Sequence, residues 1–399
     1  MPEHPVNPDI DLLDGRFYAA DPHSAFRWMR ENAPVYFDEK NQVWGITRHA
    51  HVQEVAKSPQ LFCNGQGMRP DSPPLPSMIN MDGVLHKRRR NLVNSGFTPR
   101  RVADQEAKVR QVCVDLIERV APCGSCEFVM EVAAHLPMIM IGDMLGVAPE
   151  DREALLRWSD DLILGTSATA TPQAAEGAAK AFAEYATYNR RVVLDRRTRP
   201  PQEDLMSVLV HAEIDGERLD DEALLQESLL ILIGGDETTR HVLTGGLYQL
   251  LLHPEQQQRL AADPTRIPQA VEEMLRWVTP IQNMARTATR DVSFHGQQIR
   301  AGDKLLLLYP SANRDEEVFE EPFRFDTARD PNLHLAFGGY GPHFCLGSSL
   351  ARLELRVMFE ELLARLPDIH LTCSEPPPLR PSNFIAGIEA LPVAFTPRG

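Results

Sequence analysis

The sequence predicts a mainly α-helical protein with a small β region. Helical periodicity dominates from about residue 100 to 280, and residues 221–252 form one helix-like run that is apolar on nearly every face, as in a central buried helix. Strand-like patterns are short and few. The 399 residues, 43% of them hydrophobic, can bury a large core, and no linker or repeat divides them. We therefore expect a single domain over residues 1–399.

The expected β region draws on both ends of the chain. We expect β-rich portions at roughly residues 1–60 and 285–335, and a helix-rich remainder. Segments 42–47, 292–299 and 304–308 have strand-like composition. Because Gly302 separates the last two, we expect them to pair as a hairpin.

Composition excludes some classes of function. A net charge of -15 argues against a nucleic-acid partner. Residues 1–30 are rich in Pro and charged residues and contain no apolar stretch long enough for a signal peptide or membrane anchor, so we expect a cytoplasmic protein.

Six irregularly spaced cysteines do not make a disulfide framework. Cys123 and Cys126 have the spacing of a metal or redox half-site, but no second pair completes it, and we interpret them as incidental loop thiols.

The helix expected over residues 221–252 contains an unusual run, GGDETT, at 234–239. Two mid-helix glycines cost roughly 1 kcal/mol each relative to alanine, and an acid pair among apolar neighbours carries a desolvation cost. Local rules broken together mark a functional site. A widened groove with room for dioxygen would explain them, with Asp236 or Glu237 supplying protons and the Thr238 hydroxyl donating a hydrogen bond to the oxygen. A packing kink with solvated acids is the alternative.

One cysteine, Cys345, stands in a glycine-rich loop, and a helix-like segment, 348–354, follows it. The sulfur therefore lies at a helix N-terminus, where the dipole and unpaired N–H groups lower the pKa of the thiol and hold a thiolate. As an axial ligand of haem iron, a thiolate donates electron density and favours O–O cleavage. We expect Cys345 to be such a ligand. A buried structural thiol is the alternative.

Four cationic side chains are candidates to bind the two haem propionates. His86 and Arg90 are one helical turn apart, and Arg286 and His343 follow later in the chain. The planar fork of arginine suits carboxylates, with which it forms bidentate, charge-assisted bonds. For the basic run 86–90 alone, a solvated basic face is the alternative.

In combination and in order, these signals resemble the cytochrome P-450 superfamily of haem-thiolate monooxygenases in its soluble bacterial form. The resemblance covers essentially all 399 residues. It implies the cytochrome P-450 fold, with haem b between the long central helix and the cysteine loop. It also implies Cys345 as the proximal iron ligand and Glu237 and Thr238 as the oxygen-activating pair.

The same resemblance assigns further residues. Glu273 and Arg276, which share one predicted helix face, would form a buried structural network with Arg329. In the cysteine loop, Gly341 and Phe337 would contact the haem. The family places its phenylalanine seven residues before the cysteine, whereas Phe337 is eight residues before it, so this loop has one extra residue.

Segments 11–18, 64–71, 157–162 and 233–241 are similar to the bacterial cholesterol and cholest-4-en-3-one 26(27)-hydroxylases, enzymes of steroid metabolism and cholesterol catabolism. This similarity implies that one oxygen atom of dioxygen enters a terminal side-chain methyl of a sterol. Segment 70–81 would line the entrance. The expected wall residues are Met81, Leu232, Ile233, Gly234 and Ile281. Because a fold does not fix the substrate, a monooxygenase of a fatty acid, terpene or macrolide remains an alternative, as do a peroxide-driven enzyme and a non-catalytic haem-thiolate sensor.

The sequence shows no Gly-x-Gly-x-x-Gly fingerprint of a flavin or nicotinamide site, so we expect electrons to arrive from separate proteins, a ferredoxin and a ferredoxin reductase. A basic patch on the cysteine side of the haem would steer an acidic ferredoxin by charge. The expected members of this patch are residues 87–90, Arg100, Arg101, Arg352 and Arg356.

Overall fold

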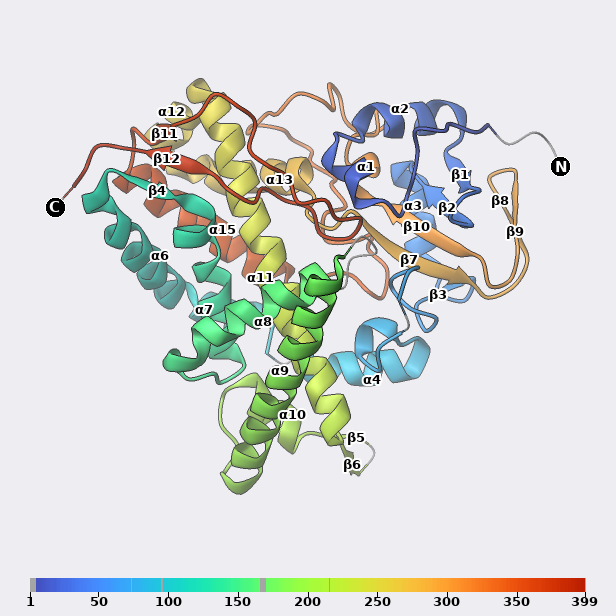
Figure 1. Ribbon diagram of the computed structural model, residues 1–399, viewed down its shortest axis with the longest axis horizontal. Helices are drawn as coiled ribbons and strands as arrows, with labels where there is room; N and C mark the ends of the chain where they lie inside the picture. The colour runs from blue at the N-terminus through green and yellow to red at the C-terminus, as the bar shows by residue number, and fades with distance from the viewer. Residues whose placement is uncertain (1–4, 73, 95, 166–169, 215, 399) are drawn as a thin grey trace.

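Helices lie around one long central helix, and a small sheet stands at one end of the molecule (Figure 1). This computed structural model describes residues 5–72, 74–94, 96–165, 170–214 and 216–398. The helices are α1 (Gly15–Ala19), α2 (His23–Asn32), α3 (His49–Lys57), α4 (Gly83–Asn94), α5 (Pro99–Asp104), α6 (Glu106–Val120), α7 (His135–Met144), α8 (Arg152–Gly165), α9 (Pro172–Thr198), α10 (Leu205–His211), α11 (Asp221–Leu252), α12 (Pro254–Ala262), α13 (Ile267–Val278), α14 (Tyr309–Ala312) and α15 (Ser348–Arg365). The strands are β1 (Val35–Asp38), β2 (Val43–Ile46), β3 (Phe62–Cys63), β4 (Ser125–Glu127), β5 (Glu213–Ile214), β6 (Glu217–Arg218), β7 (Asn283–Ala288), β8 (Val292–Phe294), β9 (Gln297–Ile299), β10 (Lys304–Leu308), β11 (His370–Leu371) and β12 (Pro392–Ala394). The prediction of a mainly helical fold with a small β region is confirmed.

The central helix is α11, which spans 32 residues and packs against α7, α9, α13 and α15. Asp220 caps its N-terminus by accepting a hydrogen bond from the N–H of Ala223. Most of its side chains are buried, as its apolar character on nearly every face requires. Gly235 permits the close approach of α7, because a Cβ at this position would lie 2.4 Å from Cδ1 of Ile141. The helix predicted over 221–252 is confirmed at both ends.

The largest sheet has the strand order β1-β2-β10-β7-β3. β10 pairs parallel with β2 on one side and antiparallel with β7 on the other. Its leucines, 305–308, are fully buried, as expected for a strand that is covered on both faces. The sheet therefore joins the N-terminal strands to the region around residue 300.

The predicted hairpin between segments 292–299 and 304–308 is wrong. Instead, β8 and β9 pair with each other inside the first segment, with Phe294 opposite Gln297. Their two-residue turn has positive φ at both positions, 47° at His295 and 84° at Gly296, which matches the twist of a tight hairpin. Segment 304–308 is left free to enter the larger sheet as β10. Residues 309–335 of the expected β-rich portion contain α14 and no strand.

A second sheet, β11-β12-β4, ties the C-terminal end of the chain to residues 125–127. The main hydrophobic core lies among α6, α7, α11, α13 and α15, and two smaller clusters flank the five-stranded sheet. Among the helices that the structure describes, none is both long and apolar enough to cross a membrane.

Candidate active site

A cavity lies between α11 and the loop that precedes α15. Its walls come from segments far apart in the chain: residues 64–97, the middle of α11, residues 280–286, the cysteine loop and residues 384–385. Most of the side chains that line it are aliphatic or aromatic. The polar ones gather near Cys345 and the cationic residues described below, so the cavity combines a reactive polar end with an apolar remainder.

Cys345 lines this cavity directly before α15, whose N-cap is Gly347. Its backbone N–H donates to the carbonyl of Phe337 at 2.9 Å, which fixes the loop. Burial raises the pKa of the thiol, whereas the N–H groups of Gly347 and Ser348 and the cations Arg90 and Arg352 oppose that shift. The sulfur thus faces the cavity from a helix N-terminus, as the sequence predicts, but the pKa of the thiol is raised and not lowered as expected, because burial outweighs the helix N–H groups.

The extra residue of the cysteine loop is accommodated by local turns. Gly338 (φ 96°) and Tyr340 (φ 60°) both have left-handed backbone conformations. Phe337 still lines the cavity, with the guanidinium carbon of Arg352 4.5 Å from its ring centroid. Gly341 does not line the cavity: a Cβ there would lie 1.9 Å from the carbonyl oxygen of Ala56, so this glycine seats the loop on α3. Its expected contact with the haem is therefore not found.

The four propionate candidates all line the cavity. The rings of His86 and His343 stack with centroids 4.0 Å apart, and Arg90 donates to the carbonyl of Phe344. Burial, reinforced by neighbouring cations, lowers the pKa of both imidazoles, that of His343 to about 2. Both imidazoles are therefore neutral hydrogen-bonding groups at neutral pH.

Arg90 and Arg286 have no carboxylate partner within the described part of the chain. Arg286, on β7, is buried and donates to the carbonyl of Ala285 at 2.8 Å. A buried guanidinium without an anion is costly. These residues therefore fit a haem, whose two propionates would supply the missing negative charges while its iron meets the Cys345 sulfur.

One face of α11 borders the cavity, including Gly234 and Thr238. No neighbouring atom lies within 4 Å of the position that a Cβ at Gly234 would take, so the helix surface is open there. The Thr238 hydroxyl donates to the carbonyl of Gly234 at 2.9 Å. This hydroxyl therefore lies on the face of α11 that borders the cavity, and its predicted hydrogen bond to oxygen stays a prediction.

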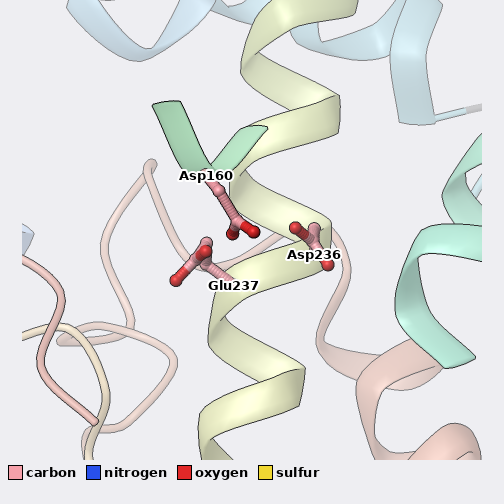
Figure 2. A group of neighbouring side chains, drawn as sticks. All are labelled: Asp160, Asp236 and Glu237. Atoms are coloured by element: carbon pink, nitrogen blue, oxygen red, sulfur yellow. The ribbon is translucent and has the colours of Figure 1, made fainter. Parts of the chain in front are cut away.

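Asp236 and Glu237 do not line the cavity, although both were predicted as proton donors to it. Both side chains are fully buried, outside the face of α11 that lines the cavity. In Figure 2 the carboxylate of Asp160, which comes from α8, lies between those of Asp236 and Glu237. Arg240 donates to all three, at 2.7 Å to Asp160 and 3.0 Å to Asp236.

The two acids of α11 have opposite protonation tendencies. Burial raises the pKa of Asp236 to about 7, despite the opposing charge of Arg240. Burial would also raise the pKa of Glu237, but Arg240, His241 and Arg380 together hold that pKa well below its usual range. Asp236 is therefore the more easily protonated of the two acids, and Glu237 stays ionised.

The three residues predicted to form a structural network are brought together. Nη2 of Arg276 lies 2.7 Å from Oε1 of Glu273, and Nε of Arg329 lies 3.1 Å from Oε2. Arg276 also donates to the carbonyl groups of Asn313 and Pro322. The Glu273 and Arg276 side chains are completely buried, so each depends on the other for its charge balance.

Of the predicted wall residues, Ile233, Gly234 and Ile281 line the cavity, and Met81 and Leu232 do not. Leu232 is fully buried on another face of α11. The i, i+4 series 234, 238 and 242 lines the cavity, whereas 232, 236 and 240 do not.

Met78 and Ile79, in the segment 70–81 expected at the entrance, line the cavity. The sequence analysis missed other lining residues, and the apolar ones include Phe97, Met284, Phe384 and Ile385. Glu354 on α15 is another: burial, with a smaller contribution from Asp236, raises its pKa to about 8. No local pattern marks these residues, because they come from segments that meet only in the folded chain.

The expected basic patch is partly neutralised. Arg352 pairs with Glu272 at 2.7 Å, and Arg356 pairs with Glu106 at 2.7 Å. Lys87, Arg100 and Arg101 are exposed. A shallow groove between α5, α13 and α15 lies beside these residues and includes Arg352 and Arg356.

Comparisons with known proteins agree with this geometry. Residues 138–383 match the family model described as Cytochrome P450. A protein named Steroid C26-monooxygenase from Mycobacterium tuberculosis is 51% identical over 392 residues, 98% of each chain, and one from Mycolicibacterium smegmatis is 49% identical over 98% of this chain and 97% of its own. Among solved structures, a Mycobacterium marinum cytochrome P450 in complex with pseudoionone has a TM-score of 0.90 at 33% identity, covering 99% of this chain and 100% of that one. A Bacillus megaterium protein in complex with testosterone has a TM-score of 0.86 at 34% identity, covering 94% and 98%.

Proposed function

The chain belongs to the cytochrome P450 family, and from this we propose that it hydroxylates the terminal side-chain methyl, C26 or C27, of cholesterol or cholest-4-en-3-one. It is a P450 monooxygenase that binds haem b. The proposed substrate rests on one observation. About half of all residues, over nearly the full length, are identical to those of relatives named for oxidation at steroid C26.

The cavity supports this proposal chemically. Bound haem supplies the oxidising chemistry that moves one oxygen atom of dioxygen into a C–H bond. Cys345 would hold the iron, and Arg90, Arg286, His86 and His343 would hold the propionates. The task of the other residues is to orient one carbon and to exclude water.

The apolar part of the cavity suits a sterol. Its walls at Met78, Ile79, Phe384 and Ile385 offer hydrocarbon contacts and few hydrogen bonds. The opening at Gly234 leaves room beside the Thr238 hydroxyl for a slender group such as a side-chain terminus. In this arrangement Thr238 donates a hydrogen bond to oxygen species, and the ring system extends toward residues 64–79.

Electrons reach this monooxygenase from redox partner proteins. We propose an acidic ferredoxin, reduced by its reductase, as the immediate donor. Exposed Arg100 and Arg101 beside the groove between α5 and α15 support a docking site whose on-rate falls with rising salt. All six cysteines are free thiols, which supports the cytoplasm as the compartment.

The direct test is a titration of the purified ferric protein with cholest-4-en-3-one, followed through haem absorption. A methyl-branched fatty acid and a macrolide serve as matched ligands. A saturable shift toward high spin with the sterone, at micromolar or tighter affinity, and a product oxygenated at the terminal methyl are the expected results. A shift with another ligand but none with the sterone would reject the substrate and leave the family assignment in place.

A further inference from the structure

One buried carboxylate of α11 has no part in the site described above. Glu227 lies about three turns before Thr238 on the same helix, and its side chain is completely buried. Leu230 and Ile231, which follow it by one turn, line the cavity. Because a buried carboxylate carries a large desolvation cost, its presence beside the cavity indicates a specific task.

Glu227 joins α11 to residues 74–81, which we call the entrance segment. Its Oε1 accepts a hydrogen bond from the Met78 N–H at 2.8 Å and lies 3.3 Å from Nη1 of Arg89, which comes from α4. Among the residues that the structure describes, this is the one hydrogen bond between the entrance segment and α11. Oε2 has no hydrogen-bond partner within the same described residues. One backbone N–H and one guanidinium therefore stabilise the buried group.

The other hydrogen bonds of the entrance segment lead to the loop that precedes it. The Asn80 side chain accepts a hydrogen bond from the Met68 N–H at 2.8 Å, and the Asn64 side chain donates to the Ile79 carbonyl at 3.2 Å. These bonds shape the loop, but they do not reach the central helix. The bond from Glu227 therefore sets where the shaped loop lies relative to α11.

The bond from Glu227 holds part of the cavity wall. Met78 and the next residue, Ile79, both line the cavity, so their side chains move if the backbone at Met78 is released. Thr238 lies about 16 Å further along the helix axis, at about 1.5 Å per residue. This distance is close to the length of an extended sterol. A sterol with its side-chain end beside Thr238 therefore has its ring system near the wall that Glu227 holds.

The strength of this contact depends on pH. Burial raises the pKa of the Glu227 carboxyl to about 7, although the charge of Arg89 and the Met78 N–H oppose that shift. The entrance segment faces the carboxyl with a backbone N–H, and α9 presents the neutral side chains of Tyr185 and Asn189 to the next residue of α11. The bond to Met78 is therefore charge-assisted above pH 7 and weaker below it.

We propose that Glu227 is a positioning residue that fastens Met78 and Ile79 to α11 and so builds the part of the cavity wall that receives the sterol ring system. The inference rests on the proposed sterol hydroxylation and assigns a residue to the ring end of the substrate, remote from the reacting carbon. Loss of the carboxylate releases the wall at that end. Ligands with rings then bind less tightly, and ligands held only beside the haem bind as before.

The test compares Glu227→Leu with the wild-type holoenzyme in spectral titrations. The Kd for cholest-4-en-3-one should rise about tenfold, equivalent to about 1.4 kcal/mol, and the Kd for imidazole, which needs only the iron end of the cavity, should stay near the wild-type value. Amide hydrogen exchange of the entrance segment should be faster in the variant, because the Met78 N–H loses its acceptor. Glu222→Gln changes an exposed carboxyl of the same helix and should match wild type in all three measurements.

Glu227→Gln keeps an acceptor for the Met78 N–H but carries no charge. The Kd of wild type for the sterone should fall several-fold from pH 6 to pH 8 as the carboxyl ionises, and the Kd of Glu227→Gln should stay constant over the same range. This conservative variant also covers the case in which Glu227→Leu fails to fold.

Four outcomes would overturn the inference: an unchanged Kd for the sterone in Glu227→Leu, an equal loss of affinity for the sterone and imidazole, unchanged amide exchange of the entrance segment, or the same pH dependence in wild type and Glu227→Gln. If wild type itself binds no sterone, the proposed function fails instead. The exchange measurement needs no ligand, so it still decides whether Glu227 holds the wall, and the two failures are thereby distinguished.

Discussion

His241 and Gly387 lie in such close contact that a Cβ added to Gly387 would fall 2.0 Å from Nδ1 of the imidazole. His241 is fully buried and bonded to Glu237, so it cannot turn aside without breaking that contact. The bare backbone at 387 is what allows residues 379–388, the C-terminal turn, to lie against α11.

Gly387→Ala should therefore displace the C-terminal turn. We expect a loss of about 1–3 kcal/mol of stability from overpacking and a several-fold rise in the Kd for cholest-4-en-3-one, measured by thermal unfolding and spectral titration. Gly177→Ala, in α9 with open space around its Cα, is the matched control and should be neutral or slightly stabilising. Equal behaviour of the two variants would contradict the close packing at 387.

Thr238→Ala should uncouple electron consumption from product formation. Removing the hydroxyl that faces the cavity should lower product formed per reductant by about tenfold, with peroxide making up the difference. The Kd for substrate should change little, because the many other apolar side chains of the cavity wall remain. Thr244→Ala removes a hydroxyl of α11 that bonds to the His241 carbonyl away from the cavity, and it should stay coupled. Assays of released peroxide and of product on both variants test this prediction. Equal coupling in the two variants would contradict it.

Arg286→Gln should weaken haem binding, because a buried cation facing a propionate would be lost. The expected result is haem transfer to an acceptor protein at least tenfold faster than from wild type, a change of about 1.4 kcal/mol. Arg290→Gln, exposed just beyond β7, is the control and should retain haem normally. Equal transfer rates in the two variants would remove Arg286 from the haem site.

Arg276→Ala should destabilise the protein strongly. It leaves the buried Glu273 carboxylate with only Arg329 and Asn332 as side-chain partners, and breaking a buried ion pair in this way costs about 3–5 kcal/mol. Differential scanning calorimetry should show a clear fall in Tm. Arg324→Ala breaks an exposed ion pair with Glu321 and should leave the Tm unchanged.

Glu354 should make stability depend on pH. Burial raises the pKa of its carboxyl to about 8, so the folded protein keeps a proton that the unfolded chain releases near its ordinary pKa. Stability from this group is present at low pH and is lost as pH rises between the two values, at about 1.4 kcal/mol per pH unit. The Tm of Glu354→Gln should therefore fall less between pH 6 and pH 9 than the Tm of wild type. A parallel pH profile in the variant would show that Glu354 is charged in the folded state.

Much of the site was predictable because its signals are local. The long apolar helix, the glycine and threonine of its GGDETT run, and the cysteine before a helix each occupy one short segment, and Gly234, Thr238 and Cys345 line the cavity. All four propionate candidates line the cavity, although only Arg90 and Arg286 among them are cations at neutral pH, and their contact with the propionates stays a prediction.

The predictions that were wrong depend on helical phase and on pairing between segments far apart in the sequence. Asp236 and Glu237 were assigned to the cavity by residue type, although their phase on α11 turns them away from Thr238. The contacts of Glu237 with Arg380 and of Arg240 with Asp160 join elements more than 70 residues apart, and no sequence period records them. The hairpin error arose in the same way, because both segments read as strands and only the sheet decides which strand each one joins.

The parallel pairing of β2 with β10 has a consequence for how the chain is made. Trp44 on β2 donates to Asp303 at 2.9 Å, across 259 positions of sequence. During synthesis, the edge of β2 that pairs with β10 therefore stays unpaired until most of the polypeptide has left the ribosome. Such distant pairing slows folding. The N-terminal strands are thus the part of the nascent chain most in need of a chaperone.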